Sequence, residues 1–336
     1  MLRKPLSKQQ VINAIERKSD GSIPLMLHKW WGDGLEAHLG ADTLAEISND
    51  IPEDINMLWY TEPGNTTSYT DNPNYRFGYK DYTGAQTHSI GETVVLLTDW
   101  SELDNFLENF PTPHEEGSFD GLKIDGRYTL GCFWRFFHER LWTVRGMENL
   151  MMDYYDYMDE LKILCARFLE FYKVIIDRYH ALGCDGIFTS DDLGFQTGPM
   201  MSPAIFEELY LPFYKEFIGY AHEKKMHVFL HSCGDNTLLM DYLIEAGLDV
   251  FHPVQKGPMD MAKTAERFGE QITFLVGVDV QDLLPNATAD EVQAEIAEMK
   301  RIFKPERGML LSMGNGILHD TPKENIRAAL VEMIKC

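Results

Sequence analysis

The residues best suited to chemistry in this sequence are His231 and Cys233, which are separated by one residue in the segment HVFLHSC. If that segment is a strand, positions i and i+2 face the same side, so an imidazole and a thiolate can hold one Zn²⁺ together. Zinc takes about four ligands, and the same spacing is also typical of a buried structural histidine and cysteine. The pair therefore predicts a metal site only in combination with further ligands.

Further polar and aromatic residues follow five other short apolar runs. They are His28, Lys29, Trp30 and Trp31 after IPLML, Asp191 and Asp192 after DGIFTS, His252 and Gln255 after DVF, Asp279 after FLVGV, and Ser312 and Asn315 after GMLL. In a barrel of parallel strands the active site is built at the carboxyl ends of the strands. We therefore expect these side chains to line one polar pocket.

Two groups within this set have alternative interpretations. Asp191 and Asp192 are suited to binding a cation or a polar substrate, but Asp192 is equally suited to capping the next turn. The aromatic residues Trp30, Trp31, Phe133 and Trp134 would suit a flat aromatic ligand, although aromatic residues at this density are also typical of a core.

The elements that must position these residues alternate between short apolar runs and amphipathic stretches. We predict strands over 23–27, 55–60, 126–133, 184–190, 227–232, 249–253, 272–278 and 308–314. We predict helices over 101–110, 156–182, 202–225, 236–247, 259–269, 289–303 and 321–334, with aromatic-rich helices between 134 and 157. Ser7 with Gln10 indicates a capped N-terminal helix, Ser202 and Thr321 are candidate N-caps, and residues 72–97 alternate like a hairpin.

Eight strands alternating with helices predict an α/β fold, a (β/α)₈ TIM barrel with N-terminal helical and hairpin additions. The 336 residues carry no linker or repeat, so we expect residues 1–336 to form a single domain. A doubly wound open sheet is the alternative, but no glycine-rich dinucleotide fingerprint follows any of the runs.

The net charge of the chain restricts its binding partners, and its cysteines indicate the compartment in which it works. With 30 Lys+Arg against 53 Asp+Glu, the net charge of −23 argues against binding to nucleic acid or to an anionic membrane surface. The five cysteines are scattered and odd in number, and neither an export signal nor an apolar run long enough to cross a bilayer is visible. We therefore expect free thiols and a cytoplasmic protein.

From about Cys184 onward the sequence resembles the uroporphyrinogen decarboxylase superfamily, and within it the corrinoid-linked methyltransferase branch. The resemblance is carried by DDLGFQTGPMMSPAIFEELYLPFYKE, HSCGD, HPVQ, FGEQITFLVGVDVQDLL, GMLLSMGNGI and TPKENI. It implies a (β/α)₈ barrel with its pocket at the carboxyl ends of the strands. True decarboxylases begin with an Arg-containing segment that holds substrate carboxylates, whereas this chain has MLHKWWGDG.

The resemblance also implies site residues. Zinc methyltransferases of the family pair HxC with a later cysteine in a GCG-like turn, and here the matching turn is Gly314, Asn315 and Gly316. The implied metal ligands are His231, Cys233 and Asn315, with Asp279 or another acidic residue as an alternative to Asn315. The expected catalytic residues are His231, Cys233 and Asp191, and the expected substrate-binding residues are His28, Trp30, Trp31, Asp192, Gln196, Gln255 and Asp279.

The function implied is an enzyme, a zinc-dependent methyltransferase acting between a small methylated substrate and cobalamin. No cobalamin motif is present in this chain, so the corrinoid would be held by a separate corrinoid protein. The tryptophans and the missing third thiolate favour an aromatic methyl ether as substrate. The alternatives are a methylcobalamin:thiol methyltransferase of the coenzyme M type, a uroporphyrinogen decarboxylase-like lyase and a non-catalytic binding barrel, and a homodimer is left open.

Overall fold

A computed structural model of the chain describes residues 3–27, 31–61, 95–110 and 119–335. Seven parallel strands form one sheet in the order β1-β2-β3-β6-β7-β8-β9. They are β1 (Ile55–Trp59), β2 (Tyr128–Cys132), β3 (Gly186–Ser190), β6 (His227–His231), β7 (Val250–His252), β8 (Thr273–Val278) and β9 (Met309–Met313). Because both faces are covered, strands such as TFLVGV are buried along their whole length. These strands confirm the predicted α/β architecture.

The position of the eighth strand is taken by residues 24–26, which lie between the two edge strands. Met26 N donates to Leu311 O and Leu311 N donates to Pro24 O, while Asp54 N donates to Leu25 O just before β1. The predicted strand over 23–27 is therefore a single parallel bridge, Leu25 to Leu311. Pro24 has no backbone N–H, so this segment has one hydrogen-bond donor fewer for pairing with its neighbouring strands, which limits the length of the strand. The sheet is nonetheless joined from β9 to β1, as in a TIM-like barrel.

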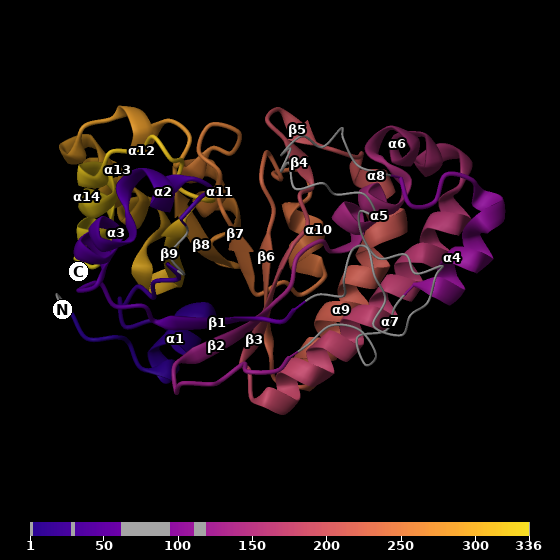
Figure 1. The fold of residues 1–336 in the computed structure, drawn as a ribbon, viewed down its shortest axis with the longest axis horizontal. Helices are drawn as coiled ribbons and strands as arrows, with labels where there is room; N and C mark the ends of the chain where they lie inside the picture. Colours follow the sequence, from indigo (N-terminus) through magenta and orange to yellow (C-terminus); the bar gives the residue numbers. More distant parts are fainter. Residues whose placement is uncertain (1–2, 28–30, 62–94, 111–118, 336) are drawn as a thin grey trace.

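The helices surround this sheet. They are α1 (Lys8–Ile15), α2 (Leu35–Leu39), α3 (Ala41–Ser48), α4 (Leu103–Asn109), α5 (Phe137–Arg145), α6 (Met147–Asp156), α7 (Met158–Leu182), α8 (Pro203–Ile205), α9 (Leu211–Glu223), α10 (Met240–Glu245), α11 (Met261–Phe268), α12 (Leu283–Asn286), α13 (Ala289–Phe303) and α14 (Lys323–Met333). Figure 1 shows α13 and α14 on one side of the strands and α7 and α9 on the other. The short hairpin of β4 (Gly194–Phe195) and β5 (Gly198–Pro199) lies at the upper end of this view, and α1 lies near the lower end.

The interior of the barrel is apolar and is closed at its lower end by α1. Val11, Ala14 and Ile15 of this helix pack against barrel side chains that include Leu130, Phe229 and Leu275. The predicted capping box of Ser7 and Gln10 begins the helix. Trp59 and Trp134 pack against the same cluster and are only partly buried. The barrel is thus a filled core with functional groups at its upper end.

Several predicted boundaries differ from the structure. The predicted helix 202–225 is divided by a π-helical turn over Phe206–Tyr210, two residues before Pro212, which has no N–H to continue the helical bonding. The predicted helix 236–247 begins only at Met240, because the Asn236 amide instead donates to the carbonyl oxygens of the preceding loop. Thr321 does not cap α14, whose N-cap position is Pro322. Most of the predicted hairpin lies outside the described residues.

Two further predictions concern the described residues alone. Their four cysteines, Cys132, Cys165, Cys184 and Cys233, are free thiols, as predicted. Across the described part of the chain, no helix combines the length and the apolar character needed to cross a membrane.

Candidate metal centre

The upper ends of β3 and β6 bring three potential metal ligands together. His231 is the last residue of β6 and pairs in register with Ser190, the last residue of β3. Cys233 Sγ lies 3.3 Å from His231 Nε2, which lies 3.7 Å from Asp192 Oδ1. The three ligand atoms all lie within 4.8 Å of one another. The predicted pair of His231 and Cys233 is therefore joined by Asp192, which was predicted as a substrate-binding residue.

The loops after the two strands hold this cluster in place. Cys233 N donates to Asp192 Oδ1 over 2.8 Å, and Leu193 N donates to Ser232 Oγ over 2.9 Å. Gly234 has a φ of +81°, and a Cβ there would lie 2.2 Å from the carbonyl oxygen of Gly194. Only a glycine allows the two loops to approach so closely.

The geometry of the three donors fits one zinc ion. Ligands about 2.0–2.3 Å from a tetrahedral ion lie about 3.3–3.7 Å apart, which agrees with the separations of His231 Nε2 from Cys233 Sγ and from Asp192 Oδ1. Imidazole, thiolate and carboxylate are all ligands that zinc accepts. Three protein ligands would leave one position open, which is the arrangement of catalytic rather than structural zinc sites.

Burial sets the protonation of these groups. It lowers the pKa of His231 to about 4 and raises the pKa of Asp192 and, more strongly, that of Cys233. Asp192 and Glu139 also raise the pKa of the Cys233 thiol, because a negative charge on either carboxyl group repels the thiolate. Without a cation this cluster holds a neutral imidazole and a thiol. A divalent cation bound here would instead favour the thiolate of Cys233, because the thiol loses its proton when its sulfur binds a metal.

Asp191 occupies a different position from its neighbour. Its side chain is fully buried and accepts bonds from His138 N, Glu139 N and the Tyr214 hydroxyl at 3.2, 2.8 and 2.6 Å. It therefore binds the first turn of α5, although burial raises its pKa to about 7. In this structure the oxygens of Asp191, which was predicted as a catalytic residue, bond α5 and the Tyr214 hydroxyl of α9.

Glu139, which the sequence analysis did not single out, lies beside this cluster. Its carboxyl oxygens each lie 2.8 Å from Ser190 Oγ, which donates to them. Burial, followed by the charges of Asp192 and Asp191, raises its pKa well above the ordinary value. Because Glu139 is in the first turn of a helix that follows β2, its sequence position resembles that of an ordinary solvent-facing glutamate.

Aromatic side chains border the cluster. The Trp134 ring lies 5.5 Å from the ring of His231 and 5.1 Å from the ring of Trp59, measured between centroids. Trp59 ends β1 and Trp134 follows β2, so both are residues at strand ends. Trp134 was part of the predicted aromatic group, whereas Trp59 was missed although its position at a strand end was the signal that could have found it.

A small cavity of about 40 Å³ opens beside Cys233 at the ends of β7, β8 and β9. It is lined by Cys233, Pro253, Gln255, Lys256, Gly277, Val278, Asp279, Val280, Gln281, Gly314 and Asn315. Gln255 Oε1 accepts a bond from Gly234 N over 2.7 Å, so this predicted residue also supports the Cys233 loop. Asn315 Nδ2 donates to Cys233 Sγ over 3.7 Å. Asn315, a predicted metal ligand, thus contacts the sulfur through its nitrogen, whereas Asp192 directs a carboxylate oxygen toward His231 Nε2.

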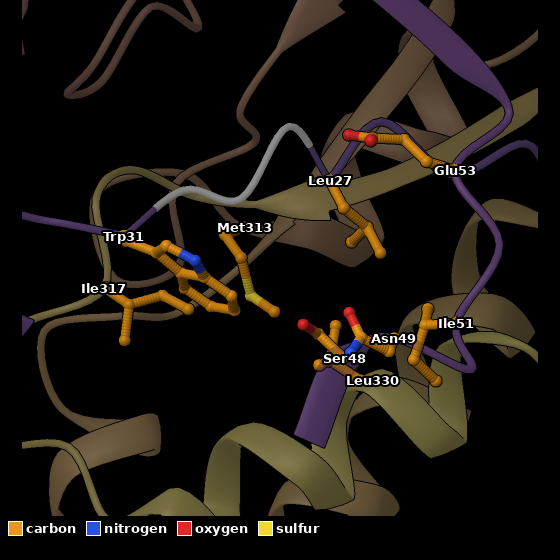
Figure 2. Close-up of a pocket in the computed structure, with 9 residues that line it drawn as sticks. All are labelled: Leu27, Trp31, Ser48, Asn49, Ile51, Glu53, Met313, Ile317 and Leu330. Atoms are coloured by element: carbon orange, nitrogen blue, oxygen red, sulfur yellow. The ribbon is translucent and has the colours of Figure 1, made fainter. Parts of the chain in front are cut away.

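The remaining predicted residues lie at different distances from this cavity. Asp279 lines it, but its carboxylate accepts from Gln281 N, Asp282 N and Leu283 N. Gln196 lines a larger neighbouring depression that shares Asp279 with the cavity. Trp31 lines a separate apolar cavity of about 170 Å³ with Leu27, Met313 and Ile317 (Figure 2), and it is not among the described residues that line the Cys233 cavity. The reason is its bridge to Ile317, which pairs the Trp31 segment with the chain beyond β9. His28 and Trp30 lie outside the described residues.

Comparison with known proteins points to one family. A sequence model of the family described as uroporphyrinogen decarboxylase (URO-D) matches residues 142–335, more than half of the chain. A curated relative, the methylated-thiol–coenzyme M methyltransferase of Methanosarcina mazei, is 28% identical over 120 residues. That match covers 34% of this chain and 31% of the relative, so it spans about a third of either protein.

A solved structure shares the fold over nearly the whole chain. It is described as a methyltransferase from Methanosarcina mazei and has a TM-score of 0.61, covering 97% of this chain and 97% of that chain. The identity between the two is 16%, so the likeness concerns the fold alone.

Proposed function

The chain belongs to the uroporphyrinogen decarboxylase (URO-D) family, and from that premise we propose that it is a zinc-dependent methyltransferase. In this proposal it moves a methyl group between a small methylated substrate and the cobalamin of a separate corrinoid protein. The observation that carries the proposal is the convergence of Asp192, His231 and Cys233 at the upper end of the barrel. The curated relative, whose name describes a methyltransferase, supports the same reaction class.

The three donors would hold the zinc, and the remaining groups would bind and orient the substrate. When bound, zinc supplies a Lewis acid that stabilises negative charge on the heteroatom to which the methyl group is attached. The Cys233 cavity would receive the methyl-bearing end of the substrate, Gln255 fixes the loop that carries Cys233, and the buried Glu139 carboxyl keeps a proton close to Asp192. Trp134 lies against the ring of His231 and Trp59 packs against Trp134, so this aromatic pair would limit the access of water to that side of His231.

We favour an aromatic methyl ether as the methyl donor. Methyl transfer from an ether breaks the carbon–oxygen bond, both electrons of that bond stay on oxygen, and the oxygen finally takes up a proton. An oxygen leaving group suits a metal site that has a carboxylate in place of a second thiolate. A carboxylate is a harder ligand than a thiolate, and it makes the metal a better partner for oxygen than for sulfur. The tilted pair of Trp59 and Trp134 offers an aromatic surface to a flat ring.

A methylated thiol is the second candidate substrate class. The specific observation in its favour is the name of the curated relative, which acts on methylated thiols and coenzyme M. The two candidates differ in the leaving atom, so a substrate panel separates them.

Decarboxylation of a porphyrinogen is less well supported. Among the described residues that line the Cys233 cavity, the only cationic side chain is Lys256, which is paired with Glu295 at 2.7 Å. A substrate with several carboxylates requires several cations nearby. Conversion of uroporphyrinogen to coproporphyrinogen by the purified protein would support the lyase against our proposal.

The test of the proposal combines metal content with methyl transfer. We expect about one zinc per chain by elemental analysis, and formation of methylcobalamin from methoxyaromatics or methyl thiols when the chain is mixed with a corrinoid protein in the Co(I) state. Asp192→Asn should remove both, whereas Asp260→Asn, at the exposed cap of α11, should remove neither. A folded, zinc-free protein, or turnover unaffected by Asp192→Asn, would contradict the proposal. A catalytically inactive binding barrel would show zinc without turnover of any substrate.

The place of action and the assembly also belong to this proposal. The free thiols of the described cysteines are what a reducing cytoplasm maintains, and we propose a cytoplasmic protein on that ground. The homodimer stays a prediction to be checked by the mass of the protein in solution.

A further inference from the structure

Behind the three donors, two histidines of neighbouring strands contact each other. His231 and His252 are partners in the register of β6 and β7, and their Nδ1 atoms lie 2.8 Å apart. Both side chains are buried, at 3% and 0% exposure. On its other side, His252 Nε2 lies 3.0 Å from the carbonyl oxygen of Met313 at the end of β9. Figure 2 shows the Met313 side chain among the residues that line the separate apolar cavity.

The Met313 carbonyl fixes the positions of the protons in this chain of contacts. A carbonyl oxygen only accepts, so His252 Nε2 must carry a hydrogen. Both rings are buried, and burial disfavours a charged imidazolium, so each ring is neutral and carries one N–H. His252 Nδ1 is then an acceptor, and the proton in the contact between the two rings belongs to His231 Nδ1.

This assignment leaves His231 Nε2 with its lone pair. That atom is the one that faces Cys233 Sγ and Asp192 Oδ1. A metal binds only an unprotonated ring nitrogen, and the hydrogen bond made by the other nitrogen decides which one is unprotonated. From the sequence, His252 is predicted to lie at a strand end, and no separate function is predicted for it.

We infer that His252 is a positioning residue that keeps the proton of His231 on Nδ1 and thereby keeps Nε2 ready to bind a metal ion. The inference rests on the proposed function only for the identity of the metal. Without the acceptor on His252, a proton on His231 Nδ1 would be buried with no partner. The proton would then move to Nε2, where Asp192 and Cys233 can accept it, and the metal-binding lone pair would be lost.

The experiment compares two substitutions at this position. His252→Phe keeps a ring in the space but removes the acceptor, whereas His252→Asn places an amide oxygen near the position of Nδ1. The tautomer of His231 is read from the ¹⁵N chemical shifts of its imidazole in metal-free protein. The zinc dissociation constant is measured by competition with a chromophoric chelator, and thermal unfolding checks that each variant is folded.

In the wild type we expect the proton on Nδ1 of His231. In His252→Phe it should move to Nε2, and zinc affinity should fall by about 10- to 100-fold, as for other outer partners of ligating histidines. His252→Asn should restore the wild-type tautomer and most of the affinity, which a merely structural role for the ring would not predict. A wild-type proton on Nε2, or a His252→Phe protein with unchanged tautomer and affinity, would overturn the inference.

These readings are independent of methyl transfer. The tautomer concerns the metal-free chain and the affinity concerns zinc alone. Failure of every methyl donor would therefore contradict the proposed function without affecting this inference. Conversely, an unchanged zinc affinity in His252→Phe would contradict the inference and leave the methyltransferase proposal in place.

Discussion

Asn315 occupies the position at which the zinc methyltransferases that the chain resembles carry a cysteine, and its Nδ2 contacts Cys233 Sγ. Asn315→Cys would bring a second thiol to the three donors. We expect zinc affinity to increase at least tenfold and the ratio of thiol to ether turnover to rise, because a softer site favours sulfur. Chelator competition and the substrate panel measure both effects. Asn315→Ser is the control, because serine is close to cysteine in size but has no sulfur. An equally large gain in zinc affinity in Asn315→Ser would show that the added thiol is not the cause.

His138 makes a pH-dependent contribution that can be measured separately. It is buried against the hydroxyls of Tyr154 and Tyr210 and the sulfur of Met200, and burial lowers its pKa to about 3. Below pH 6.5 the unfolded chain takes up a proton on this residue that the folded chain does not, so His138 destabilises the folded state increasingly as the pH falls.

A His138→Asn substitution removes this titration together with the hydrogen bonds. We therefore expect the loss of unfolding free energy caused by the substitution to be largest at pH 7 and to shrink by about 2 kcal/mol at pH 5. Denaturant unfolding of both proteins at the two pH values measures it. A loss that is equal at both pH values would show that His138 is not held neutral.

For single residues, the sequence predicted which side chains lie at the strand ends better than it predicted what each of them does. His231, Cys233 and Asp192 are at strand ends, and barrel geometry is enough to expect them in one pocket. The distinction between Asp191 and Asp192 depends on which carboxylate faces α5 and which faces Cys233, and adjacent residues of a loop give no periodicity from which to decide this. Glu139 was missed because its burial arises from the packing of α5 over β3.

The loops after β3 and β6 are joined by the approach of Gly194 to Gly234. We expect Gly234→Ala to lower zinc affinity at least tenfold, because the new Cβ must displace the Gly194 carbonyl and with it the loop that carries Asp192. Gly257→Ala is the matched control, since Gly257 also has a positive φ of +96° but its Cβ would meet no atom within 4 Å. Both variants carry a backbone strain of roughly 1–2 kcal/mol, so only the difference in zinc affinity reports the contact. Equal affinities would contradict it.

Elements with a long regular pattern were predicted well, and their irregular ends were not. The seven buried strands and the long helix α7 follow from hydrophobic runs and periodicity. The bridge at residues 24–26, the π-helical turn and the late start of α10 each depend on one residue, namely Pro24, Pro212 and Asn236. The effects of these residues on hydrogen bonding become visible only when the partners are placed.

For the molecule as a whole, closure of the barrel depends on Asp54. This fully buried carboxylate accepts from Arg3 through both oxygens, from Leu6 N at 2.7 Å and from Leu25 N at 2.8 Å. It therefore ties the N-terminal segment and the bridging residues 24–26 to the start of β1.

We expect Asp54→Ala to lower the unfolding free energy by about 3–5 kcal/mol, because it leaves Arg3 and two backbone donors without their acceptor. Asp50→Ala is the control, since the pair of Asp50 and Arg327 is partly exposed and should contribute at most about 1 kcal/mol. Denaturant unfolding measures both. If Asp54→Ala lowers the unfolding free energy no more than Asp50→Ala does, the hydrogen bonds of Asp54 do not hold the barrel closed.

The contact between Gly194 and Gly234 also has an evolutionary consequence. Two loops that touch through bare main chain cannot diverge independently, because any side chain gained by one requires the other to withdraw. A chimaera that receives only one of the two loops from a distant relative should therefore lose the metal centre, whereas one that receives both together should keep it. New substrate preferences in this lineage would then arise by joint replacement of the paired loops.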